Sequence, residues 1–255
     1  MTRLLIVLLL VLSGCTRPEP PLVLFLAGQS NMEGHGRTAD LNAEEAVWPS
    51  SVRYFDRWQE VEPMGRNGFG PEVGMAQVLS AAMPGREIRL VKVAVGGTSL
   101  LDWAPQWDST TAAITGHADA GPMYAHLMAA VDSVTAGEDV EVGAAFWMQG
   151  ERDARFADVG PGYVERITDL VTALRSDLGR ADLPFILGLI NPPADRYPAL
   201  DTVRAAQRAL AEDDANVWLV DTDDLSKWDD KLHYDSAGQM ELGRRFARAY
   251  LKRGE

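Results

Sequence analysis

The chain has 255 residues, 46% of them apolar, and a formal net charge of −13. That length suffices for one domain with a well-buried core, and no fixed-period repeat or low-complexity tract divides it. The acidic balance disfavours nucleic-acid binding, because phosphate contacts need a clustered basic surface and the Lys and Arg residues are scattered. The charge indicates no particular partner beyond ordinary solubility.

The N-terminal residues have the pattern of an export signal. Arg3 precedes an apolar run at 4–12, which has the length of a signal-peptide core and is too short to span a bilayer. Residues 12–15, Leu-Ser-Gly-Cys, resemble a bacterial lipobox, in which cleavage precedes a lipid-modified cysteine; an ordinary signal peptide is the alternative. Cys15 is the one cysteine of the chain, which excludes an internal disulfide.

We therefore expect a signal peptide at 1–14, a lipidated Cys15 at the start of a proline-rich tether at 15–21, and a folded domain at 22–255. This organisation predicts an exported bacterial lipoprotein that is anchored to a membrane and faces the periplasm or the cell surface.

Short apolar runs within the domain have the character of buried parallel strands, at 22–27, 88–95, 142–148, 185–190 and 217–221. Segments with apolar residues at helical spacing lie between and after them, at 71–83, 123–134, 163–178, 200–210 and 237–251. Asp235 or Ser236 is the expected N-cap of the last helix. Alternating strands and helices predict a three-layer α/β/α sandwich around a mainly parallel, five-stranded sheet.

Polar segments follow four of these strands. They are Gly-Gln-Ser-Asn-Met at 28–32, Gly-Gly-Thr-Ser at 96–99, Gln-Gly-Glu-Arg-Asp at 149–153 and, after a longer loop, Asp-Lys-Leu-His at 230–233. Because ligands bind beyond the carboxyl ends of parallel strands, all four segments should converge at one edge of the sheet.

The side chains of these segments complement one another as an acyl-transfer site. The Ser30 hydroxyl needs a base to become a nucleophile, and His233 is the natural one. Asp230 can orient the His233 ring and fix its tautomer. The backbone N–H groups of Ser30 and Gly97 suit a developing oxyanion, and the amide of Gln149 is a third candidate donor.

Each segment by itself has an ordinary structural explanation, as a tight turn or a solvated acidic loop, and their joint position at strand ends is what favours a site. The four histidines also limit the choice of base. His117 and His126 are expected to be structural or exposed. His35 lies close to Ser30 in sequence and is the reserve base.

Other hydrolase and nucleotide-binding classes are disfavoured. The elbow of α/β-hydrolases is Gly-x-Ser-x-Gly, and Met32 stands where its second glycine belongs. The sequence has no paired histidines at metal-ligand spacing, no Gly-x-Gly-x-x-Gly and no P-loop. We expect neither a metal nor a cofactor.

The four segments, in this order and over 22–251, resemble the SGNH hydrolases, and more narrowly the sialate O-acetylesterase-like carbohydrate esterases, which include acetylxylan esterases. The resemblance implies a flavodoxin-like sheet and a triad of Ser30, Asp230 and His233. It also implies oxyanion donors from Ser30, Gly97 and Gln149, the last in place of the asparagine of the wider group. The family often has His and Ser where this chain has Met148 and Arg152.

The expected activity is removal of acetyl groups from a carbohydrate through an acyl-enzyme. Glu151 and Arg152 are candidate substrate-binding residues, although Glu151 and Asp153 can instead brace the Gln149 loop and Arg152 can belong to a surface ion-pair cluster. Trp103, with Trp107, offers a sugar-stacking surface or packs in the core. The long segment at 34–70 is expected to shape the pocket.

Two other functions stay open at this point. One is a non-catalytic glycan-binding module on the same fold, which the presence of Ser30, Asp230 and His233 disfavours. The other is a lipase or thioesterase, although no loop is rich in the large apolar residues that an acyl groove needs.

Overall fold

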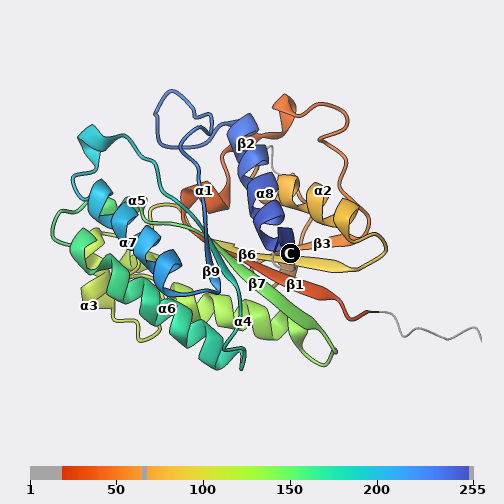
Figure 1. The fold of residues 1–255 in the computed structure, drawn as a ribbon, viewed down its shortest axis with the longest axis horizontal. Coiled ribbons are helices and arrows are strands. Elements are labelled where there is room, and N and C mark those ends of the chain that lie inside the picture. The colour runs from red at the N-terminus through yellow and green to blue at the C-terminus, as the bar shows by residue number, and fades with distance from the viewer. Residues whose placement is uncertain (1–18, 65–67, 253–255) are drawn as a thin grey trace, which may run out of the picture.

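The structure is a computed structural model that describes residues 19–64 and 68–252. At its centre lies a seven-stranded sheet with the order β4-β3-β6-β1-β7-β8-β9 (Figure 1). The bounds of its strands are β1 Leu22–Gly28, β3 Val52–Asp56, β4 Gln59–Glu60, β6 Ile88–Ala94, β7 Glu141–Met148, β8 Phe185–Gly188 and β9 Val217–Val220. All neighbouring pairs are parallel except β3–β4. A separate antiparallel pair joins β2 Gly36–Arg37 to β5 Gly68–Phe69.

The five predicted strands are confirmed, but the predicted number of strands is wrong. The two further strands, β3 and β4, lie in the segment at 34–70 that was expected to be a loop. Neither forms a continuous apolar run: β3 includes the half-buried Arg53 and the exposed Asp56, and both residues of β4 are exposed. By contrast, every residue of β1 is buried, as befits a central parallel strand that is covered on both faces.

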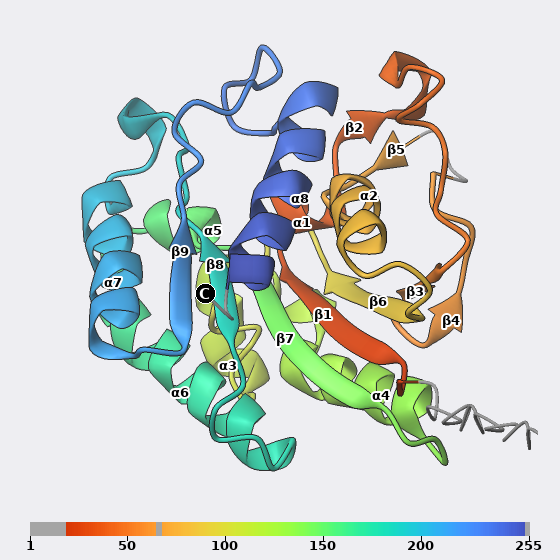
Figure 2. The same ribbon diagram turned by 45° about the vertical axis from the view of Figure 1, so that its right-hand side comes forward.

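Helices cover both faces of the sheet (Figures 1 and 2). Their bounds are α1 Ser30–Glu33, α2 Glu72–Ala82, α3 Ser109–Ala112, α4 Met123–Thr135, α5 Glu151–Ala154, α6 Tyr163–Asp177, α7 Leu200–Asp213 and α8 Ser236–Leu251. Helices α2 and α8 pack together over one face, while α4, α6 and α7 cover the other. Asp235 is the N-cap of α8, since its carboxylate accepts a hydrogen bond of 2.9 Å from the Gly238 N–H.

The strand order places the site. After β1 the chain forms β3, β4 and β6 on one side of it and then β7 on the other, so the carboxyl end of β1 is a topological switch point. Gly28 ends β1 with φ of +147°, and a Cβ there would lie 2.1 Å from the carbonyl oxygen of Met148. Only glycine fits this close approach, which turns the chain sharply into Ser30.

No helix in the described ranges is long and apolar enough to cross a bilayer. The predicted signal peptide at 1–14 and the lipidated Cys15 lie outside the described residues.

Candidate active site

Ser30, His233 and Asp230 form a hydrogen-bonded chain. The Oγ atom of Ser30, the first residue of α1, lies 3.1 Å from Nε2 of His233. On the other side of the ring, Nδ1 lies 2.7 Å from Oδ2 of Asp230. With the proton on Nδ1, the ring donates to Asp230 and its free Nε2 can accept the proton of Ser30.

The loop before α8 holds Asp230 as an anion. Its Oδ1 accepts hydrogen bonds from the backbone N–H groups of Leu232, at 2.8 Å, and His233, at 3.0 Å. Partial burial opposes ionisation, but these two bonds and the His233 ring hold the pKa of Asp230 below its ordinary value. The orienting carboxylate therefore stays charged well into the acid range.

Asn31 ties the nucleophile segment to the histidine loop. Its Oδ1 accepts from the N–H of Tyr234 at 3.1 Å, and its Nδ2 donates to the carbonyl of Leu232 at 3.3 Å. These two groups flank His233, so Asn31 fixes the backbone on both sides of the base. The same Nδ2 donates to Oε1 of Glu151 at 2.8 Å.

Glu151, which was expected to contact substrate or to brace its own loop, is only 2% exposed. Its Oε2 is buried and has no protein partner among the described residues. Burial raises the pKa of Glu151, against the hydrogen bond from Asn31. The Glu151 carboxylate therefore holds the Asn31 side chain in place.

Two backbone N–H groups are free for an oxyanion. Those of Ser30 and Gly97 donate to no protein acceptor within the described ranges. Gly97 has φ of +76°, and a Cβ there would lie 2.7 Å from Nε2 of His117. The preceding N–H, of Gly96, is held at 2.9 Å by Oε2 of Glu33 at the end of α1.

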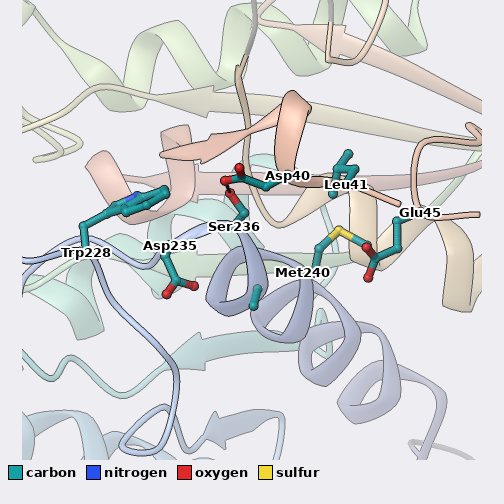
Figure 3. Close-up of a pocket in the computed structure, with 8 residues that line it drawn as sticks. Asp40, Leu41, Glu45, Trp228, Asp235, Ser236 and Met240 are labelled. Atoms are coloured by element: carbon teal, nitrogen blue, oxygen red, sulfur yellow. Dashed lines mark hydrogen bonds between the residues drawn. The ribbon is translucent and has the colours of Figure 1, made fainter. Parts of the chain in front are cut away.

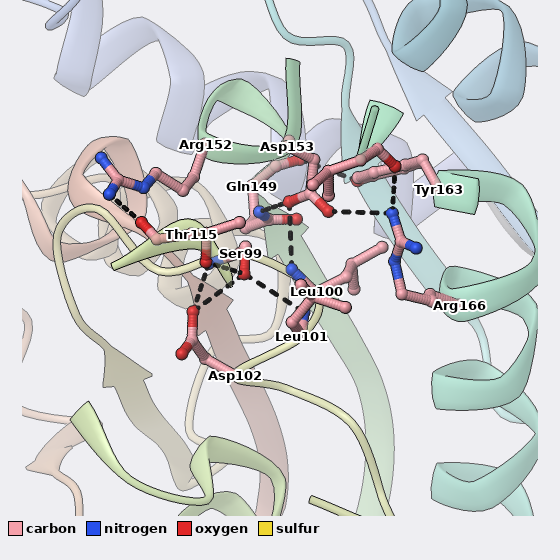
Figure 4. Close-up of polar contacts among 12 residues, drawn as sticks. Ser99, Leu100, Leu101, Asp102, Thr115, Gln149, Arg152, Asp153, Tyr163 and Arg166 are labelled. Atoms are coloured by element: carbon pink, nitrogen blue, oxygen red, sulfur yellow. Dashed lines mark hydrogen bonds and ion pairs between the residues drawn. The ribbon is translucent and has the colours of Figure 1, made fainter. Parts of the chain in front are cut away.

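Contrary to the expectation that it would donate to an oxyanion, the Gln149 side chain lies among buried polar partners (Figure 4). Its side chain is fully buried, and Nε2 donates to the carbonyl of Thr98 at 3.1 Å and to Oδ2 of Asp153 at 2.7 Å. Both amide hydrogens are thereby used, which leaves none for an oxyanion. Gln149 instead supports the glycine loop from below, and the expectation of a third donor at this position is corrected.

Asp153 completes that support. It is fully buried, accepts from the Leu100 N–H at 3.0 Å and lies 3.5 Å from the guanidinium of Arg166 (Figure 4). Burial raises the pKa of Asp153, although the hydrogen bond from Gln149 and the charge of Arg166 oppose the rise.

Sequence reasoning missed Gln29, although it stands next to Ser30 in the same motif. Its Oε1 accepts from the backbone N–H groups of Gly150, at 3.4 Å, and Arg152, at 3.1 Å. These bonds define which end of the amide is oxygen, so Nε2 is the free end. Gln29 lines the pocket, which makes it the side-chain amide available there.

The triad opens into a pocket of about 410 Å³. It is lined by Gln29, Ser30, Glu33, His35, Gly96, Gly97, His117, Glu151, Arg152, Arg155, Tyr197, Leu232 and His233.

Arginines form part of the pocket wall. Neither Arg152 nor Arg155 has a carboxylate partner among the described residues. The Arg152 guanidinium donates to the carbonyl of Thr115, and burial followed by the charge of Arg155 lowers its pKa. Arg152 is thus not part of an ion-pair cluster.

Trp103 does not offer a stacking surface. Its ring is fully buried and packs edge-on against Trp147, with 4.9 Å between the ring centroids. Its Nε1 donates to Oγ1 of Thr98 at 3.2 Å. The expectation that Trp103 binds sugar is corrected, because the ring is a core residue beneath the glycine loop. Trp107 is partly buried and does not line the pocket.

His35, the reserve base, lies flat against the catalytic histidine candidate. Its ring stacks on His233 with 3.9 Å between centroids and 24° between planes.

A separate pocket of about 300 Å³ lies beside the start of α8 (Figure 3). Trp228 forms one wall, and the Ser236 hydroxyl donates to Asp40 at 2.5 Å. No histidine lines this pocket, so its serine lacks a base.

A family model and several known proteins resemble this chain. Residues 21–252 match the family model described as carbohydrate esterase, sialic acid-specific acetylesterase. A probable carbohydrate esterase of Arabidopsis thaliana is 29% identical over 260 residues, which is 92% of either chain.

Solved structures share the fold. An Arabidopsis thaliana protein superposes with a TM-score of 0.76 at 26% identity, covering 92% of this chain and 99% of that one. A carbohydrate acetylesterase of Xanthomonas citri gives 0.67 at 20% identity, with coverage of 90% and 55%. A lipase/acylhydrolase of Enterococcus faecalis gives 0.53 at 12% identity, with coverage of 91% and 96%. The last two likenesses concern the fold alone, an α/β sandwich of the SGNH type.

Proposed function

Because the chain belongs to the carbohydrate esterase, sialic acid-specific acetylesterase family and is a carboxylic ester hydrolase, we propose that it removes O-acetyl groups from carbohydrates with Ser30 as nucleophile. The observation that carries this proposal is the pair of contacts at His233: 3.1 Å from Nε2 to Ser30 Oγ and 2.7 Å from Nδ1 to Asp230. The first contact is short enough for Ser30 to pass its proton to His233, and the second holds the ring in the tautomer that can accept it.

In the proposed reaction, His233 Nε2 takes the Ser30 proton while Oγ attacks the acetyl carbonyl carbon. The resulting oxyanion accepts hydrogen bonds from the N–H groups of Ser30 and Gly97. When the carbon–oxygen bond to the sugar breaks, His233 returns the proton to the sugar oxygen, which leaves as a hydroxyl. His233 then deprotonates a water that attacks acetyl-Ser30, and acetate leaves as Ser30 regains its proton.

We assign the third oxyanion donor to Gln29 Nε2. Its amide is held by two backbone N–H groups at Oε1 and lines the same pocket as Ser30 and Gly97. A donor fixed in advance costs no reorganisation when charge develops on the substrate oxygen.

The sugar is proposed to lie against Arg152, Arg155 and Tyr197. Guanidinium groups without acidic partners suit the hydroxyl and carboxylate oxygens of a carbohydrate. The family and the Arabidopsis relative support a carbohydrate as the alcohol portion of the ester.

We propose further that the enzyme acts outside the cytoplasm as a lipid-anchored protein. The support is the Leu-Ser-Gly-Cys sequence at 12–15 after a short apolar run, with Cys15 as the one cysteine.

The test is hydrolysis of p-nitrophenyl acetate, with acetate release from a panel of O-acetylated glycans. Ser30→Ala should abolish both activities and labelling by a fluorophosphonate, while Ser133→Ala, an exposed serine on α4, should leave all three unchanged. Circular dichroism checks that both variants fold. Undiminished turnover in Ser30→Ala would contradict the assignment, and a wild type that neither labels nor releases acetate would be a glycan-binding module.

A further inference from the structure

The His35 ring stacks on the His233 ring. The two ring nitrogens of His233 contact Ser30 and Asp230, and imidazole nitrogens bond in the plane of their ring, so these contacts do not restrain the ring faces. The His35 ring covers one face of that plane, with 3.9 Å between centroids and 24° between planes. His35 as a residue is exposed, so its remaining surface separates His233 from solvent on that side.

Trp228 joins the two histidines through their backbones. Its backbone N–H donates to the carbonyl of His233 at 2.9 Å, and its indole Nε1 donates to the carbonyl of His35 at 3.0 Å. The guanidinium of Arg37 lies 4.0 Å from the centroid of the Trp228 ring. The stack is therefore fixed at both ring and backbone, although the two histidines come from opposite ends of the chain.

The geometry does not favour His35 as a base. Its ring nitrogens have no hydrogen-bond partner in the described part of the chain, and no carboxylate fixes its tautomer. The proton-transfer contacts of Ser30 are made by His233 instead.

We propose that His35 is a positioning residue, whose neutral ring keeps the His233 imidazole aligned with Ser30 and Asp230 and shields one of its faces from water. This inference rests on the proposed function, in which His233 becomes an imidazolium at each proton transfer. A neutral partner is required, because a second positive charge at this distance would repel that imidazolium.

The charges around the stack are compatible with this role. Asp230, on the same loop as His233, contacts the His233 ring. The other titratable or charged residues that line the pocket with His35 and His233 are Glu33 on α1, Glu151, Arg152 and Arg155 on or beside α5, His117 and Tyr197. Packing against His233 removes water from the His35 ring, and together with repulsion from His233 this lowers the pKa of His35 to about 4, although Asp230 opposes the shift. His35 is thus uncharged at neutral pH.

Three substitutions distinguish ring stacking by His35 from a direct chemical role of its ring nitrogens. His35→Phe keeps a neutral ring without nitrogens and should retain kcat/KM within about threefold. His35→Ala removes the ring and should lower kcat/KM for p-nitrophenyl acetate by about tenfold to a hundredfold, since the base loses its alignment.

His35→Arg places a permanent cation on the stack. Its kcat/KM should fall at least as far as that of His35→Ala, because the imidazolium that forms at His233 in the proposed reaction would stand beside a fixed positive charge. Replacement of His126, a histidine on α4 outside the pocket, by Ala serves as the matched control and should leave kcat/KM unchanged.

Two results would overturn the inference. One is a His35→Phe variant as impaired as His35→Ala, which would give the ring nitrogens a direct role. The other is wild-type kcat/KM in both His35→Ala and His35→Arg. Failure of the proposed function is recognised separately, since Ser30→Ala would then keep its activity.

Discussion

Two glutamines at the ends of adjacent strands differ in how they support the chemistry. Gln29 Oε1 is fixed by two backbone N–H groups, which leaves its nitrogen toward the pocket. The Nε2 of Gln149 donates to Thr98 and Asp153, and the side chain is fully buried. Under the proposed function, Gln29 donates to the substrate oxyanion, whereas Gln149 supports the loop that carries Gly97.

Isosteric substitutions separate these two roles. Gln29→Glu keeps the oxygen that accepts from Gly150 and Arg152 but loses the donor, so kcat should fall by about 10²–10³ with little loss of stability. Gln149→Glu turns an oxygen toward the carbonyl of Thr98 and the carboxylate of Asp153. Its free energy of unfolding should fall by about 1–3 kcal/mol.

Urea unfolding and p-nitrophenyl acetate kinetics on both variants provide the measurement. If Gln149→Glu lost kcat as severely as Gln29→Glu while keeping wild-type stability, the oxyanion donor would be Gln149.

Glu151 should make the enzyme less stable as pH rises. Burial raises its pKa in the folded state, so between the unfolded and folded pKa values the native protein binds more protons than the unfolded chain. The free energy of unfolding therefore falls as pH increases through that window. Glu151→Gln keeps the Oε1 that accepts from Asn31, and should be at least as stable as wild type at pH 8.

Thermal unfolding from pH 4 to pH 8 measures this difference. Wild type and Glu151→Gln should converge at the acid end, and parallel curves over the whole range would refute the buried-carboxylate explanation. Glu151→Ala is the contrasting variant: it removes the acceptor of Asn31 and should lower kcat, because Asn31 aligns the His233 loop.

At the scale of elements, a buried ion pair holds three of them together beneath the nucleophile. The Lys92 ammonium, from β6, donates to Glu72 of α2 at 2.9 Å and to the carbonyl of Glu33 at 2.7 Å, where α1 ends. The side chains of Lys92 and Glu72 are 8% and 3% exposed. Burial opposes the charge on Lys92, but Glu72 and Tyr54 together outweigh it and raise the pKa of Lys92 above its ordinary value.

Glu72→Gln leaves that ammonium buried without its counter-ion. Its free energy of unfolding should fall by about 3–5 kcal/mol, as when one member of a buried pair is removed. The double variant Lys92→Met/Glu72→Leu should lose less, since no charge is stranded. Urea unfolding of wild type and both variants tests this, and a single variant with wild-type stability would show that the pair does not hold these elements.

Sequence patterns predicted the elements whose burial is uniform. The central strands are continuous apolar runs, and the proposed triad was predicted because Ser30 stands at a strand end and Asp230 and His233 stand in the loop before α8. Strand β3 and the edge strand β4 were missed because their exposed or half-buried residues interrupt the apolar pattern. The directions of the Gln29 and Gln149 amides depend on partners from other segments, such as Thr98, which spacing alone does not identify.

At the scale of the whole molecule, the flavodoxin-like strand order explains why distant segments meet. Because β1 lies between β6 and β7, the residues after these three strands surround one crevice, and the loop before α8 closes it. The order itself was implied by the family resemblance, whereas the stacking of His35 on His233 required the folded arrangement of both chain ends.

The direction of β1 has a consequence for how the enzyme is presented to its surroundings. The strand runs from Leu22 to Gly28, so the chain enters the domain about one strand length, roughly 20 Å, from the nucleophile that follows it. The described chain therefore joins the domain at the end of β1 that lies away from the pocket. Under the proposed lipid anchor, the tether meets the domain at the opposite end of the central strand from Ser30, so attachment there leaves the pocket open to acetylated glycans.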